Sequence, residues 1–158
     1  MRVAIVHYWL VNMGGGEKVL EALCRLYPEA HIYTHVLDRA NVSPGITRHP
    51  ITTTFIDKLP FSKKHYPRYL PLMPFALEQL DLTDYDLVIS SESGPAKGVI
   101  TRADTPHICY CHTPMRYLWD NWTEYLASSG LLTRCAMRLL LPGLRRWDVA
   151  SSFRVDHF

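Results

Sequence analysis

The sequence predicts an α/β fold, a Rossmann-like parallel sheet with helices on both faces. Short apolar runs alternate along the chain with segments of helical spacing, a pattern typical of parallel strands joined by right-handed crossovers. The runs are apolar at consecutive positions rather than at alternate ones, as expected of strands covered on both faces. With 158 residues, 47% of them hydrophobic and 20% charged, the chain is expected to form a single domain.

In the first half of the chain we expect three strands: residues 2–7, 30–36 and 51–56. Apolar residues at spacings of three and four predict a helix over residues 16–26 after the first of them. Residues 38–50 are predicted to form a loop. Four prolines between residues 57 and 74 exclude one long helix there, and a short helix is expected over residues 75–80.

In the second half we expect strands over residues 86–91 and 106–111, with a short helix over residues 96–101 between them. From Met115 onward the spacing is helical. Serine and glycine at 128–130, and Pro142 with Gly143, predict two interruptions of this helical segment.

Three glycines, Gly14 to Gly16, separate the first strand from the first helix. Glycine allows backbone N–H groups at a helix start to approach an anion closely, so the loop is a candidate phosphate site. The spacing matches neither the dinucleotide fingerprint nor the P-loop. A simple flexible turn explains the three glycines equally well.

Two further polar segments follow predicted strands, and ligands in such sheets bind at the carboxyl ends of the strands. His112 comes after the strand at 106–111 and could exchange a proton or bind a sugar hydroxyl. A strand-end histidine bonded to the backbone is the simpler alternative. Glu92 opens the other segment, where it could face the same crevice or cap a turn. His7 ends the first strand and could line the crevice or lie in the core.

Charge and cysteine content exclude some classes of function. A formal charge of +2 is too small to indicate nucleic-acid binding. Residues 134–146 nevertheless hold four arginines and no acidic residue. The helix at 131–141 could therefore lie on an anionic membrane, or it could simply pack its leucines in the core. The four cysteines lack zinc-site spacing and are expected to be buried free thiols in a reducing cytoplasm. We expect no signal peptide, since no long apolar run follows Met1.

The chain resembles retaining glycosyltransferases of family 4, which have the GT-B fold. The resemblance rests on residues 4–10 with 14–23, and on residues 85–91 with 111–120. The second pair is similar to a subgroup that includes bacterial mannosyltransferases of surface-polysaccharide assembly. In that family an N-terminal domain mainly binds the acceptor, and a C-terminal domain binds most of the nucleotide-sugar.

The resemblance implies specific roles for residues of this chain. Gly15 and Gly16 would approach the donor diphosphate, and His112 would contact the donor sugar at the reaction centre. Glu92 and Arg116 would contact the acceptor or a phosphate. The implied donor is a GDP- or UDP-linked sugar, and the implied acceptor is a glycan or a lipid-linked saccharide. No cofactor is expected, and no metal held by an Asp-x-Asp motif.

Residues 1–158 would then be one acceptor-side domain, apparently truncated, that lacks the C-terminal nucleotide-sugar domain and is inactive alone. The protein would be cytoplasmic, or peripheral on the inner face of the plasma membrane. One alternative is a non-catalytic, membrane-associated subunit of a split glycosyltransferase that binds a separate catalytic chain. A free-standing nucleotide binder is a weaker alternative, because no complete nucleotide fingerprint is present.

Overall fold

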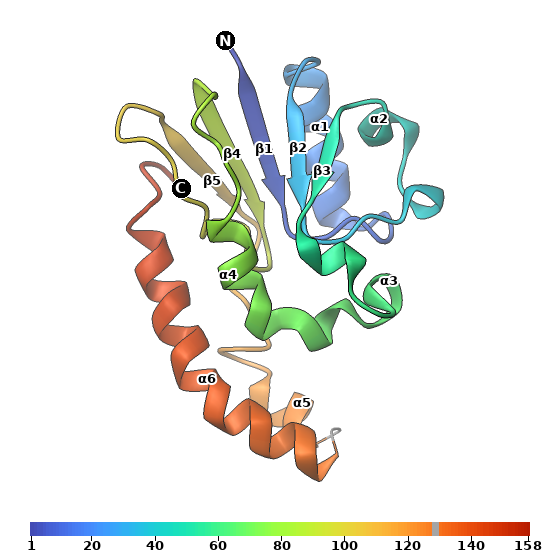
Figure 1. The fold of residues 1–158 in the computed structure, drawn as a ribbon, viewed down its shortest axis with the longest axis vertical. Helices are drawn as coiled ribbons and strands as arrows, with labels where there is room; N and C mark the ends of the chain where they lie inside the picture. Colours follow the sequence, from blue (N-terminus) through green and yellow to red (C-terminus); the bar gives the residue numbers. More distant parts are fainter. Residues whose placement is uncertain (128–129) are drawn as a thin grey trace.

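The computed structural model describes residues 1–127 and 130–158 and contains one five-stranded sheet (Figure 1). All paired strands run parallel, in the order β3-β2-β1-β4-β5. The strands are β1 (Val3–His7), β2 (His31–Thr34), β3 (Ile51–Thr53), β4 (Leu87–Glu92) and β5 (His107–Cys111). The predicted parallel α/β fold is therefore confirmed.

Helices cover both faces of the sheet. On one face, α1 (Gly15–Leu26) and α2 (Pro44–Thr47) pack on Ile5 of β1 and its neighbours. On the other, α4 (Met73–Glu78) and α6 (Leu131–Ser152) pack against Val6 and the adjacent strand residues. Successive residues of a strand point to opposite faces, which explains why β1 is buried throughout.

The second and third strands are shorter than expected, and the connections contain more helix. The expected loop at 38–50 includes α2, and the 3-10 helix η2 begins at Phe55, where strand had been predicted. Backbone N–H groups in these segments close local turns instead of extending the sheet, as between Asp57 and the carbonyl of Thr54. The remaining short elements are η1 (Arg39–Asn41), η2 (Phe55–Lys58), α3 (Ser62–His65), η3 (Tyr66–Leu72) and α5 (Trp122–Ala127).

The helix expected over residues 96–101 is absent, so that prediction was wrong. This segment forms turns, and the backbone N–H groups of Ala96 and Lys97 donate to the Glu92 carboxylate. A side chain that accepts these hydrogen bonds offers the backbone an alternative to helix.

The interruption expected at Pro142 and Gly143 is also absent, because α6 continues from Leu131 to Ser152. Leu141 and Leu144 on either side of this pair are buried, whereas Pro142 and Gly143 are exposed. Packing of the buried leucines therefore outweighs the local cost of proline in the helix. The other interruption was expected at residues 128–130. Residues 128 and 129 lie outside the described residues, and Gly130 immediately precedes α6.

A third apolar cluster lies at the carboxyl edge of the sheet, where α5 and the first half of α6 extend past the strand ends (Figure 1). It joins Val36 after β2, Met73 of α4, Met115 after β5 and Leu141 of α6. This cluster holds the segments that follow the strands in fixed positions around the edge. Within the described part of the chain, no helix is both long and apolar enough to cross a membrane.

Candidate active site

Polar side chains from three adjacent strands meet at the carboxyl edge of the sheet. His7, the last residue of β1, pairs in register with Ser91 of β4. The segment that contains His112 follows β5, the next strand of the sheet. Parallel strands end at the same edge, so residues far apart in the sequence come together here.

These side chains form a hydrogen-bonded line. Nδ1 of His7 lies 3.1 Å from the Ser91 hydroxyl oxygen, and Nε2 of His112 lies 3.0 Å from the same oxygen. The other ring nitrogen of His7 lies 3.7 Å from Glu17 Oε1, which is too long for a hydrogen bond. His7, Ser91 and Glu17 are buried, and His112 is half-buried.

The environment favours neutral histidines beside an ionised glutamate. Burial lowers the pKa values of His7 and His112 below the ordinary histidine value. Burial alone would raise the pKa of Glu17, but contacts with His7 and the backbone N–H of Gly14 outweigh it and lower this pKa. That N–H lies 2.8 Å from Glu17 Oε2. The carboxylate is therefore charged while both rings are neutral near pH 7.

The three glycines are not equivalent at the start of α1. Gly14 donates its N–H to Glu17, so this donor is occupied. A Cβ on Gly16 would lie 2.3 Å from the Tyr8 hydroxyl oxygen, whereas a Cβ on Gly15 would meet no heavy atom within 4 Å. Glycine is needed at position 16 because the Tyr8 side chain lies so close to it. The space beside Gly15 is open to a ligand.

Glu92 and Arg116 do not join this line. The carboxylate of Glu92 is fully buried, 2.6 Å from Nζ of Lys97, and accepts the two backbone hydrogen bonds of the turn. Lys97 also contacts Asp148 of α6. Glu92 therefore belongs to a buried ion-pair group. Neither of its carboxylate oxygens is exposed for the expected contact with an acceptor. Arg116 is exposed in the segment after β5.

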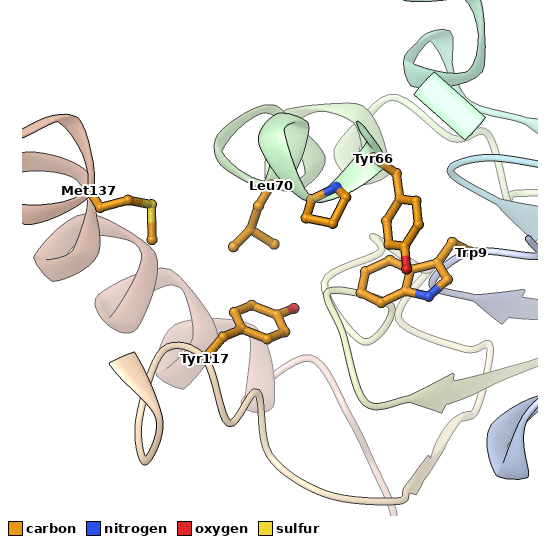
Figure 2. A pocket seen from close by; sticks show the side chains of 6 residues that line it. Trp9, Tyr66, Leu70, Tyr117 and Met137 are labelled. Atoms are coloured by element: carbon orange, nitrogen blue, oxygen red, sulfur yellow. The ribbon is translucent and has the colours of Figure 1, made fainter. Parts of the chain in front are cut away.

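An apolar cavity of about 230 Å³ lies beside this edge. Figure 2 shows its wall, to which the segment after β1, η3, the segment after β5 and α6 contribute side chains. The lining residues are Trp9, Tyr66, Pro67, Leu70, Tyr117 and Met137. The Tyr117 hydroxyl points among them (Figure 2), is itself inaccessible, and has no hydrogen-bond partner among the described residues. Burial raises the pKa of Tyr117, so this hydroxyl stays protonated and can donate.

Comparison with known proteins identifies the family. A family model described as Glycosyltransferase Family 4 matches residues 13–149, most of the chain. The chain belongs to Glycosyltransferase Family 4. No curated protein and no solved structure matches it significantly. Its all-parallel sheet with helices on both faces is consistent with the N-terminal domain of a GT-B fold.

For this family 4 glycosyltransferase domain, sequence reasoning missed two groups of residues. Ser91 was only one residue of the predicted strand at 86–91, and Glu17 only one residue of the predicted helix at 16–26. The position of Ser91 in an apolar strand, directly before Glu92, was the one available signal. The pairing of Lys97 with Asp148 spans 51 residues and leaves no local signal.

Other predicted features of the family 4 domain have mixed outcomes. The cysteines are free, but only Cys24 and Cys109 are buried, while Cys111 and Cys135 are exposed. No group of three potential metal ligands occurs among the residues that the structure describes. On α6, Leu131 and Leu139 are 77% and 82% exposed, whereas Leu141 is buried. Helix α6 thus has both a core face and exposed leucines. Packing in the core and contact with a membrane surface therefore both remain open interpretations of this helix.

Proposed function

We propose that this chain is the acceptor-side half of a retaining glycosyltransferase. The enzyme would transfer a sugar, with mannose the first candidate, from a GDP- or UDP-linked donor to a glycan or lipid-linked acceptor. The main support for the proposal is a set of contacts at the carboxyl edge of the sheet. In this family 4 chain they connect His112 to the glycine-rich start of α1. Through Ser91 and His7, this histidine connects to the first turn of α1.

Donor binding would divide between this chain and a second domain or subunit. The backbone N–H groups of Gly15 and Gly16 begin a 12-residue helix and suit a diphosphate, because a helix start favours negative charge. His112 would hydrogen-bond a hydroxyl of the transferred sugar. A separate nucleotide-sugar domain would supply most of the charge that stabilises the leaving diphosphate, so we expect this chain alone to be inactive.

The cavity favours an acceptor with an apolar part. Trp9, Tyr66 and Leu70 offer aromatic and aliphatic surface, and an apolar cavity of this size suits a ring or a short alkyl segment better than water. The ring of Tyr117 adds to this apolar wall. Arg116, exposed after β5, would meet an acceptor phosphate. Together these residues favour the lipid-linked alternative over a free glycan.

A second candidate is a non-catalytic subunit on the inner face of the plasma membrane that binds a catalytic chain. Two features favour it: the exposed leucines of α6, and the 78% exposed Phe61, which precedes α3 with its exposed Lys63 and Lys64. It differs from the first candidate in requiring no chemistry from His112.

The test is transfer by the product of the complete coding frame. GDP-mannose and UDP-sugars would be supplied as donors, with lipid-linked and free saccharides as acceptors. We expect the substitution His112→Ala to lower kcat/KM by roughly a hundredfold or more. His157→Ala, which changes an exposed histidine of the C-terminal segment, is the matched control. Full activity in His112→Ala would remove His112 from the reaction centre. No transfer by the wild-type product unless a separate catalytic chain is added would support the subunit candidate.

A further inference from the structure

In the hydrogen-bonded line at the sheet edge, chemistry determines which group donates and which accepts at each contact. We propose that Glu17, acting through His7 and Ser91, fixes the tautomer of His112. In this tautomer Nε2 of His112 carries the hydrogen and Nδ1 is an acceptor. Glu17, His7 and Ser91 are then positioning residues for His112.

The first step is the contact between Glu17 and His7. The carboxylate is buried, and Oε2 is held by the backbone N–H of Gly14 at 2.8 Å, which leaves Oε1 facing Nε2 of His7 at 3.7 Å. Negative charge beside a ring nitrogen stabilises the tautomer with a hydrogen on that nitrogen. Nε2 of a neutral His7 therefore carries the hydrogen, and Nδ1 is an acceptor.

The second step passes through Ser91. A serine hydroxyl has one hydrogen to donate and can accept with its lone pairs. Since Nδ1 of His7 is an acceptor, the hydroxyl donates to it across 3.1 Å. The serine oxygen can then only accept from His112, 3.0 Å away, so Nε2 of His112 carries the hydrogen.

For the proposed reaction this arrangement presents Nδ1 of His112 as an acceptor for a substrate hydroxyl. That consequence rests on the proposed function. The tautomer itself does not, because it follows from Glu17, His7 and Ser91 alone.

Replacing Glu17 by glutamine should reverse the whole line. Gly14 must still donate to an oxygen, so the amide oxygen of glutamine stays with Gly14 and its NH₂ group faces His7. Nε2 of His7 must then accept, Nδ1 carries the hydrogen and donates to Ser91, and Ser91 donates to Nε2 of His112. Both rings would change tautomer.

The experiment is ¹⁵N NMR of the histidine rings in the chain labelled at histidine, because protonated and unprotonated ring nitrogens differ widely in chemical shift. Spectra are taken at pH about 8, above the ordinary histidine pKa of ~6.5, so that the rings are neutral. We expect the Nε2–H form for His7 and His112 in the wild type and the Nδ1–H form for both in Glu17→Gln. Glu21→Gln, which changes a half-buried glutamate of the same helix bonded to Ser43, should change neither.

Ser91→Ala provides a second variant that does not disturb the helix start. It should leave His7 in its wild-type form and, in the double variant with Glu17→Gln, prevent the change from reaching His112. An Nε2–H form of His112 in Glu17→Gln, or the same change in Glu21→Gln, would overturn the proposal. NMR needs no substrate, so a transfer assay that fails with the expected tautomers present counts against the proposed function alone.

Discussion

Gly15 and Gly16 are adjacent residues with the same side chain, yet they are glycines for different reasons. Gly16 lies against the Tyr8 ring, so a methyl group there would collide with the protein itself. Gly15 has open space where a methyl group would be, so only a bound molecule could need that space. Stability and binding can therefore be separated at neighbouring positions.

Gly16→Ala should lower the free energy of unfolding by about 1–3 kcal/mol, since the methyl group would overpack against Tyr8. Gly15→Ala should leave stability unchanged or raise it by up to about 1 kcal/mol through helix propensity. It should raise the KM of the complete enzyme for the donor by about tenfold or more, equivalent to the loss of ~1.4 kcal/mol of binding. Urea unfolding and donor titration measure the two effects. An unchanged donor KM in Gly15→Ala would argue against a diphosphate at this helix start.

His35 should make stability depend on pH. The side chain is fully buried, with Nδ1 3.1 Å from the Thr54 hydroxyl oxygen, and burial lowers its pKa to about 4. The unfolded chain, with a histidine pKa of ~6.5, binds more protons between these values. Stability from this residue is therefore complete above pH ~6.5 and is lost as the pH falls towards 4.

The expected loss over that interval is about 3 kcal/mol. Urea unfolding at several pH values, compared between wild type and His35→Gln, isolates it because other groups titrate equally in both. Parallel curves for the two proteins would mean that His35 is protonated as easily in the folded state as in the unfolded one.

At the scale of elements, α6 is held in place by packing and not by its own sequence. Trp147 on α6 lies over Gly98 of the turn after β4, where a Cβ would be 2.1 Å from the indole ring. Gly143 in the same helix is exposed and meets no neighbouring atom. Packing of α6 on the sheet thus requires glycine at position 98. Gly143, within the helix, makes no such contact and only lowers helix stability.

Gly143→Ala should raise the free energy of unfolding by about 0.5–1 kcal/mol, because alanine is the better helix former. Gly98→Ala should lower it by about 1–3 kcal/mol, because Trp147 would have to move. Chemical denaturation of the two variants checks both signs. If Gly143→Ala destabilised the protein, α6 would not be a continuous helix at that position.

For the whole molecule, one buried ion-pair group connects the sheet to its last helix. Lys97 contacts Glu92 of β4 and Asp148 of α6, and Asp148 also accepts a hydrogen bond of 2.8 Å from Trp119. All three charged side chains are buried. Removal of the one cation would leave two uncompensated carboxylates in the core, and breaking a buried pair in this way is strongly destabilising.

Lys97→Met should lower the free energy of unfolding by about 3–5 kcal/mol. Lys64→Met, at an exposed position, should change it by less than about 0.5 kcal/mol. Thermal or urea unfolding distinguishes them. Equal stabilities for the two variants would show that the group contributes nothing to holding α6 on the sheet.

The amino-acid sequence alone predicts the strands and their parallel order. Consecutive apolar residues in β1 and β4 predict strands buried on both faces, and the alternation of strand and helix predicts parallel order. It also located His112 and the start of α1 at the edge where strands end. Such patterns are local, because a strand or helix is recognised from the burial of residues close together in the chain.

Which polar groups meet depends on contacts between elements that are far apart in the chain. His7 and Ser91 are 84 residues apart, and their contact depends on β4 pairing beside β1 in one register. For Glu92 the sequence left two interpretations open, facing the crevice or capping a turn. In the structure its carboxylate accepts the backbone N–H groups of the turn and pairs with Lys97 in the core. Both contacts have the same cause, since the free energy of a buried polar group depends on partners that come from distant elements. Local sequence carries no record of that pairing.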